Sequence, residues 1–190
     1  MSSRDTLIFD ILKSPRTVFT SQSLSLMADG VNAQALAVKM NRLVRQGHLL
    51  NLRKGVYAKE GYRVEEVACS LFKPSYISLE YVLQRAGIVF QYDSSITCVS
   101  YLTRTVEVDG HVYAFRKINY ELWAGMDGIV AQDNVNMATP ERAFLDMVYL
   151  SAGNCYFDNL RPLNKKEVLR LLPHYQSKAL TERVSQLLLL

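Results

Sequence analysis

Basic side chains spaced along a helix face and at a hairpin tip are the residues of this sequence best placed to do chemistry. Lys39, Arg42 and Arg45 recur at helical spacing in the run A-Q-A-L-A-V-K-M-N-R-L-V-R. Arg53 and Lys54 follow shortly afterwards, between two short apolar runs. Lysine and arginine on such adjacent elements hold phosphate groups. We therefore expect this part of the chain to meet a polyanion.

The positive charge of the chain lies in its first third. Residues 1–60 hold nine Lys and Arg against four Asp and Glu, a net charge of +5, whereas the remaining 130 residues hold 13 and 14, a net charge of −1. This asymmetry is expected when one module meets a polyanion and another does not. A purely solubilising role would produce the same count, so the elements that carry the charge must decide.

Two short helices are predicted at the start of the chain. Thr6 to Leu12 has its apolar residues on one face, and Pro15 ends the segment. Thr20 or Ser21 can cap a second helix, because both supply a side-chain oxygen to free backbone N–H groups. The apolar residues of these two helices, which we expect to be buried, are Leu7, Ile8, Ile11, Leu12, Leu24 and Met27.

A third helix and a hairpin follow. Asp29 and Gly30 form a tight turn, and Asn32 caps a helix that runs to about Gln46 and closes at Gly47. Two strands come next, Leu49 to Leu52 and Val56 to Ala58, with Arg53-Lys54-Gly55 at the tip between them. Three helices with a short turn before the third, followed by a basic hairpin, predict a winged helix-turn-helix in residues 1–60.

The third helix has an apolar face and a polar face at about 100° per residue. Its apolar face, Leu36, Met40, Leu43 and Val44, should pack on the first two helices. The N-terminal end of a recognition helix reaches base edges, and nearby cations hold phosphates. The residues that we expect at a DNA interface are Asn32, Gln34, Ala35 and Val38 at base edges and Lys39, Arg42, Arg45, Arg53 and Lys54 at phosphates.

The expected base contacts differ in chemistry. Glutamine can pair bidentately with adenine, and an outward valine offers an apolar surface to a thymine methyl group, so Gln34 and Val38 would read sequence. A solvated amphipathic helix without a partner would look similar, because Arg and Lys are good helix formers. The adjoining hairpin and the local charge favour the DNA interpretation.

Residues 61–190, which begin after Glu60-Gly61, are predicted to form a second α+β domain. We expect a helix from Arg63 to Leu71, a helix of residues 79–86 capped by Ser78, and a Thr139-capped helix that begins with Pro140. Between them, short runs of period two indicate an antiparallel sheet with helices on either side. The predicted strands are 96–101, 105–108, 111–115, Ile118 to Leu122, Ile129 to Ala131 and Val135 to Met137, followed at the end of the chain by a helix that carries Leu180, Val184, Leu187 and Leu188.

Catalytic and metal-binding chemistry finds little support in the sequence. Ser75 and Ser78 are interpreted as caps, and Glu141, Arg142 and Asp146 as structural groups near a helix start. The three cysteines and three histidines are scattered, which gives no zinc spacing. A nuclease would need a lysine on a strand beside its metal-binding acids, and the acids on the predicted strands lack one. We expect no enzyme activity, no metal and no cofactor.

Three stretches of the chain resemble one family. They are R-L-V-R-Q-G-H-L-L-N-L-R-K-G-V-Y-A in residues 42–58, P-S-Y-I-S-L-E from Pro74, and A-T-P-E-R-A-F-L-D-M-V-Y-L from Ala138, followed by Y-F-D-N-L. In this order they resemble the AbiE-type antitoxins, winged-helix transcriptional regulators of type IV toxin-antitoxin systems in bacterial abortive infection. The resemblance implies binding to inverted repeats in the protein's own promoter and a second domain that counters a nucleotidyltransferase toxin, directly or indirectly.

The sequence as a whole therefore predicts an α+β DNA-binding repressor and antitoxin. No run of residues approaches the roughly 18 apolar residues of a membrane span, and no leader is recognisable, so we expect a cytoplasmic protein. The alternative is a winged-helix regulator whose second domain senses a small ligand, with a pocket built from the strands around Trp123.

Overall fold

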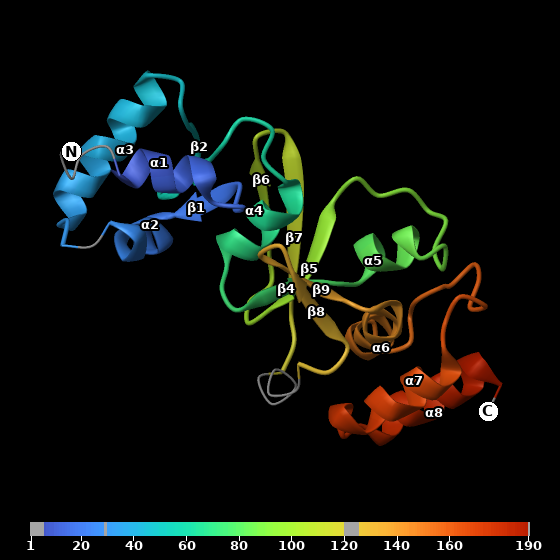
Figure 1. The fold of residues 1–190 in the computed structure, drawn as a ribbon. Coiled ribbons are helices and arrows are strands. Elements are labelled where there is room, and N and C mark those ends of the chain that lie inside the picture. The colour runs from blue at the N-terminus through green and yellow to red at the C-terminus, as the bar shows by residue number, and fades with distance from the viewer. Residues whose placement is uncertain (1–5, 29, 120–125, 190) are drawn as a thin grey trace. The chain divides into compact units, whose positions relative to one another are not determined.

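A computed structural model of the chain describes residues 6–28, 30–119 and 126–189 (Figure 1). The chain divides into two compact units, Met1–Leu71 and Phe72–Leu190, and each has a sheet of its own. The fold is α+β, as the sequence predicts.

The first unit combines helices with a small antiparallel sheet. Its elements are α1 (Thr6–Lys13), β1 (Val18–Thr20), α2 (Ser21–Met27), α3 (Ala33–Arg45), β2 (Leu50–Arg53), β3 (Val56–Ala58) and α4 (Val64–Leu71). The strand order is β1-β3-β2. The predicted helices and hairpin are present. Strand β1 was not predicted, since three residues are too few to show a period, and the predicted turn at Asp29 involves a residue outside the described ones.

A single apolar core holds α1, α2, α3 and the sheet together. It consists of Leu7, Ile11, Phe19, Leu24, Ala28, Leu36, Met40, Leu43, Leu49 and Tyr57, with Ile8, Met27 and Val44 packed against it. The buried apolar face predicted for the third helix is thereby confirmed. Leu12 is a correction, because it is 54% exposed and the buried stripe of α1 runs through Leu7 and Ile11 instead.

The predicted boundary after Glu60 differs from the boundary in the structure, because α4 belongs to the first unit. Glu66 of α4 is buried, and its Oε2 accepts hydrogen bonds from the backbone N–H groups of Thr17 and Val18 at 2.8 and 3.0 Å. Its Oε1 accepts from the Arg63 guanidinium. A buried carboxylate must be paired in this way, so Glu66 fixes α4 to the start of β1.

The second unit is built on a larger sheet. Its elements are β4 (Ser75–Ile77), α5 (Glu80–Arg85), β5 (Ile96–Ser100), β6 (Arg104–Val108), β7 (His111–Lys117), β8 (Ile129–Gln132), β9 (Val135–Ala138), α6 (Pro140–Leu150), α7 (Lys165–Leu171), the 3₁₀-helix η2 (Leu172–Tyr175) and α8 (Lys178–Leu188). The strand order is β6-β7-β5-β4-β9-β8.

The expectation of an antiparallel sheet is corrected by two parallel pairings. Strand β5 pairs with β7, and β4 pairs with β9, in parallel, whereas the other three pairings are antiparallel. Hairpin signals in a sequence report only neighbouring strands. Strand β7 pairs antiparallel with β6, its neighbour in the chain, but also inserts between β6 and β5, which no local pattern could indicate.

Several elements of this unit differ from the prediction. Strand β4 was not predicted, nor were α7 and η2. Ile118 and Asn119 lie outside any strand, and most of the predicted strand to Leu122 lies outside the described residues. The C-terminal helix is present as α8, with Leu180, Val184 and Leu188 buried.

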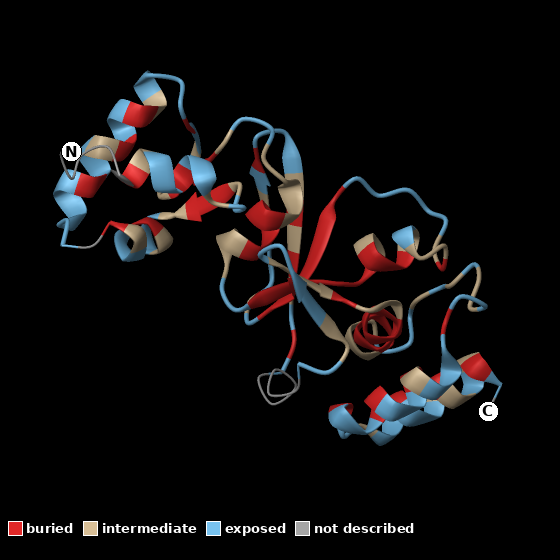
Figure 2. Ribbon diagram, viewed as in Figure 1, coloured by how far each residue is buried: buried red, intermediate tan, exposed pale blue. Residues whose placement is uncertain are grey.

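Helix α6 is the buried centre of this unit, as Figure 2 shows by its red ribbon. Every residue from Glu141 to Val148 is buried, and α6 contacts α5, α7, α8 and β9. The predicted start is confirmed, because Thr139 accepts a hydrogen bond from the Arg142 N–H and Pro140 occupies the first turn. Polar residues in this helix therefore have to be paired inside the protein.

The caps predicted at Ser75 and Ser78 are wrong. Leu79 occupies the N-cap position of α5 with φ 61° and makes no side-chain cap bond. Thr97 of β5 replaces the cap, since its hydroxyl accepts from the Tyr81 N–H at 3.0 Å. Ser78 donates to Asp146 instead, and the Ser75 hydroxyl lies buried in β4 without a hydrogen-bond partner among the described residues.

No helix in the part of the chain that the structure describes is long and apolar enough to cross a bilayer.

Candidate nucleic-acid interface

Helix α3 is fixed by its caps and by its apolar face. The Asn32 side chain accepts a hydrogen bond from the Ala35 N–H at 2.8 Å, which confirms the predicted N-cap. At the other end, Gly47 has φ +74° and follows the last helical turn. Leu36, Met40 and Leu43 are buried in the core, so the opposite face of α3 is held outward.

That outward face contains the residues predicted to contact DNA. Gln34, Ala35, Val38, Arg42 and Arg45 are exposed, and Lys39 is half-buried on the flank. Val38 is 65% exposed, so its side chain is available for an apolar contact. The N-terminal half of the face is therefore small and uncharged, and the C-terminal half is cationic.

Two asparagines, one at the N-cap of α3 and one within the helix, modify the predicted list of DNA contacts. Asn32 is exposed, but its Oδ1 is occupied by the cap bond, which leaves the side-chain amide as its free donor. Asn41 lies on the outward face, one turn after Val38, and is exposed. It was not among the predicted contacts, although its helical spacing places it between Val38 and Arg45.

The β2-β3 hairpin carries two further cations. Arg53 ends β2, Lys54 lies in the two-residue turn, and both are exposed. A register shift between Asn51 and Arg53 marks a bulge at the end of β2. Gly55 completes the turn with φ +80°, a backbone conformation that favours glycine.

The cations of α3 and of the hairpin are open to solvent. Within the described residues, Arg42, Arg45, Arg53 and Lys54 form no ion pair with a carboxylate. A solvated guanidinium or ammonium without an internal partner is available to an external anion. The outward face of α3 and the hairpin tip therefore each present two such cations to solvent.

The second unit uses its central arginine differently. Arg142 and Asp146 of α6, which are 2% and 0% exposed, form an ion pair with Nε and Oδ1 3.2 Å apart. Tyr175 donates to Oδ1 of Asp146 at 2.5 Å, and Tyr76 and Ser78 donate to Oδ2 at 3.0 and 2.8 Å. We call these five residues the buried polar cluster.

Burial controls ionisation in the buried polar cluster. It raises the pKa values of Tyr76 and Tyr175 well above that of an ordinary tyrosine, and the charge of Asp146 raises them further. Burial also raises the pKa of the Asp146 carboxyl, against which the Arg142 guanidinium and three hydroxyl donors act. The sequence-based interpretation of Arg142 and Asp146 as structural agrees with this pairing, but their partners from β4 and η2 were not foreseen.

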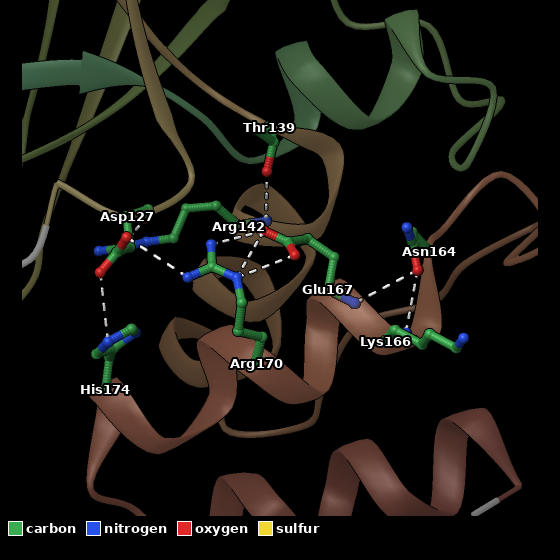
Figure 3. Close-up of polar contacts among 8 residues, drawn as sticks. All are labelled: Asp127, Thr139, Arg142, Asn164, Lys166, Glu167, Arg170 and His174. Atoms are coloured by element: carbon green, nitrogen blue, oxygen red, sulfur yellow. Dashed lines mark hydrogen bonds and ion pairs between the residues drawn. The ribbon is translucent and has the colours of Figure 1, made fainter.

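Arg142 also contacts Asp127, which belongs to a second, exposed set of polar contacts (Figure 3). Arg142 Nη1 donates to the Asp127 carbonyl at 3.1 Å, and the Asp127 carboxylate lies 3.5 Å from Arg170 Nη1 and 3.4 Å from His174 Nε2. Arg170 also donates to Glu167, and these hydrogen bonds lower the pKa of the Glu167 carboxyl. The arrangement ties α7 and η2 to the segment before β8.

The second unit was also predicted to lack a metal site, and a ligand pocket was considered for it. No group of three His, Cys, Asp or Glu side chains that could hold a metal ion occurs among the described residues. A surface hollow of about 370 Å³ lies between η2 and α8, lined by Leu172, Pro173, Gln176, Ser177, Lys178, Thr181 and Glu182. Trp123, around which a ligand pocket was predicted, lies outside the described residues.

Comparison with known proteins yields a likeness of fold. No protein-family model matches the chain, and no curated protein matches it in sequence. The crystal structure of the RV2827C protein from Mycobacterium tuberculosis matches with a TM-score of 0.53 at 13% sequence identity, over 99% of this chain and 77% of that chain. At this identity, the match concerns the fold alone.

Proposed function

We propose that the first unit is a winged helix-turn-helix that binds double-stranded DNA. Helix α3 would enter the major groove, and the β2-β3 hairpin would be the wing that lies along the backbone. The observation that carries this proposal is the exposure of Arg42 and Arg45 on the outward face of α3 and of two further cations at the hairpin tip, Arg53 and Lys54. Among the described residues, none of the four forms an ion pair.

In this proposal, the N-terminal half of the outward α3 face contacts bases and the C-terminal half contacts phosphates. Gln34 and Val38, near the N-terminal end, would contact base edges, together with Ala35 and the amide of Asn32. Lys39, Arg42 and Arg45 would hold phosphates further along the helix, which fixes position without reading sequence. Small exposed side chains at the N-terminal half favour close approach of the helix backbone to the bases.

We further propose that the protein represses its own promoter and acts as an antitoxin in the cytoplasm rather than as an enzyme. This part is supported by the three ordered stretches that resemble the AbiE-type antitoxins. Asp146 and the two tyrosines of the buried polar cluster are hydrogen-bonded to one another, which favours a structural role over a catalytic one. The partners would be inverted repeats of promoter DNA and a nucleotidyltransferase toxin, met directly or through its effects.

DNA binding is tested by the salt dependence of a gel-shift titration with promoter duplex. Replacing Arg42 and Arg45 by Ala should weaken binding to all duplexes and reduce the slope of log K against log salt by about 0.9 for each lost phosphate contact. Replacing Arg161 and Lys166 by Ala removes the same charge from exposed positions of the second unit and serves as the control. Equal slopes for both double variants would contradict the proposal.

The antitoxin role has its own test, which does not depend on DNA binding. The neighbouring gene should encode a nucleotidyltransferase, and co-expression of this chain should relieve the growth arrest caused by that enzyme. A variant with Arg42 and Arg45 replaced by Ala, expressed from a foreign promoter, should still relieve it, because we assign that role to the second unit. Continued arrest in the presence of the intact chain would reject the antitoxin role and leave DNA binding standing.

A further inference from the structure

The tip of the β2-β3 hairpin is attached to the first turn of α2. The Gly55 carbonyl accepts hydrogen bonds from the backbone N–H of Ser21 at 2.9 Å and from its hydroxyl at 3.4 Å. A Cβ atom placed on Gly55 would lie only 3.1 Å from the Ser21 Oγ. The turn and the helix start therefore touch where a side chain on the turn would crowd the contact.

Ser21 is in turn held by its neighbours. Thr20, the last residue of β1, pairs with Val56 of β3 and forms a capping box with Ser23 at the start of α2. The Ser25 hydroxyl donates to the Ser21 carbonyl at 2.9 Å. The hairpin is thus fixed at two consecutive residues, at Gly55 in the turn through Ser21 and at Val56 directly after the turn through β1.

We propose that Ser21 is a positioning residue for DNA binding, which orders the hairpin tip so that Arg53 and Lys54 reach phosphates from a fixed backbone. The inference rests on the proposed function and concerns the same site. A tip that is ordered in the free protein loses less conformational entropy on binding, so each phosphate contact contributes more to affinity. Ser21 acts through the two cations, and its own side chain makes no contact with DNA in this scheme.

Proline at position 21 removes the attachment with little disturbance of α2. Ser21 is the first residue of the helix, where proline is well tolerated, and proline supplies neither the N–H nor the hydroxyl. Thr20 has φ −92° and ψ 158°, which suits a residue before proline. The matched control is Ser21→Ala, which keeps the N–H donor and loses only the longer hydroxyl bond.

The measurement is a double-mutant cycle on duplex binding, with Ser21→Pro in one arm and the pair Arg53→Ala and Lys54→Ala in the other. We expect Ser21→Pro to weaken binding about tenfold, the cost of ordering one to two backbone residues anew. Removal of Arg53 and Lys54 should then cost less in the Ser21→Pro background than in the parent. Ser21→Pro should also lower the salt slope toward that of the hairpin double variant, whereas Ser21→Ala should stay near the parent.

The outcomes separate this inference from the function on which it rests. Additive effects in the cycle, or an unchanged salt slope for Ser21→Pro, would overturn the positioning role while duplex binding by the parent stands. Failure of the parent to bind any duplex at low salt would overturn both. If circular dichroism shows that Ser21→Pro is unfolded, Gly55→Ala replaces it in the same cycle, because the φ of +80° and the contact with Ser21 disfavour any Cβ there.

Discussion

Arginines in the two units are used in opposite ways. Arg42 and Arg45 of α3 project from a helix that buries only one face; they are exposed and form no ion pair within the part of the chain that the structure describes. Arg142 of α6 lies in a helix buried on all sides, with Asp146, Tyr76 and the Asp127 carbonyl as partners. An arginine whose donors are already used stabilises the fold, and an arginine with free donors can bind a ligand. The partners, and not the residue type, separate the two roles.

The charge of the units follows the same division. Met1–Leu71 carries a net charge of +4, and Phe72–Leu190 carries none. An excess of like charge on a small unit is unfavourable for folding but useful for attracting a polyanion. The balanced charge of the second unit allows internal pairs such as Arg142 with Asp146.

The strongest test of this contrast removes the buried arginine. Arg142→Met should lower the free energy of unfolding of the second unit by about 3–5 kcal/mol, because Asp146 is left buried without its counter-charge. Urea unfolding followed by hydrogen exchange in α6 peptides measures it unit by unit. Arg142→Met combined with Asp146→Leu should recover only part of the loss, since the buried unpaired charge is removed but the hydroxyls of the cluster lose their acceptor. A single variant as stable as the parent would show that the buried pair is dispensable.

Alkaline pH tests the buried polar cluster without mutation. The pKa values of Tyr76 and Tyr175 are raised in the folded protein, so between about pH 10 and the folded values the unfolded chain loses protons that the folded one keeps. Stability of the second unit should therefore be complete below about pH 10 and fall above it by roughly 1.4 kcal/mol per pH unit for each tyrosine. Denaturant midpoints across this range measure the fall, and Tyr76→Phe should reduce its slope. A flat profile to pH 12 would contradict the burial of both hydroxyls.

Within the first unit, Gln34 should separate base contacts from phosphate contacts. Gln34→Ala should remove about 1–3 kcal/mol of discrimination at one base pair and leave the salt slope unchanged, because glutamine reads bases and carries no charge. Selection of bound duplexes from a randomised pool measures the preference. A changed slope with unchanged preference would place Gln34 at the backbone instead.

The smallest expected effect is on the stability of the first unit when its exposed arginines are removed. Replacing Arg42 and Arg45 by Ala should change the free energy of unfolding of the first unit by no more than about 0.5 kcal/mol, as for other exposed side chains. The same urea titration used for Arg142→Met serves here, read in peptides of α3. A loss comparable with that of Arg142→Met would mean that the exposed arginines also support the fold.

Local patterns predicted the first unit better than the second. Caps and apolar periods are properties of neighbouring residues, so Asn32, Gly47 and the buried face of α3 were found directly. Glu66 was not, because its partners Thr17 and Val18 lie far back along the chain. In the second unit, the parallel pairings and the cap supplied by Thr97 likewise join distant segments.

The candidate site shows the same limit. Exposure of Gln34, Val38, Arg42 and Arg45 follows from the helical period and could be predicted. The attachment of Gly55 to Ser21 could not, because the sequence marks Ser21 only as a helix-start residue. A side chain with a local role already assigned gives no signal of a second, distant role.

The parallel pairing of β4 with β9 also bears on the order in which the chain acquires structure. Ile77 of β4 pairs with Met137 of β9, and Tyr76 donates a hydrogen bond to Asp146, which lies 70 residues further along the chain. Contacts that close so long a loop form slowly, whereas the sheet of the first unit is complete by Ala58. During synthesis, the first unit can therefore fold while later strands of the second unit are still being made. Until β7 and β9 are present, the edges of β4 and β5 that pair with them are the surfaces that a chaperone would have to shield.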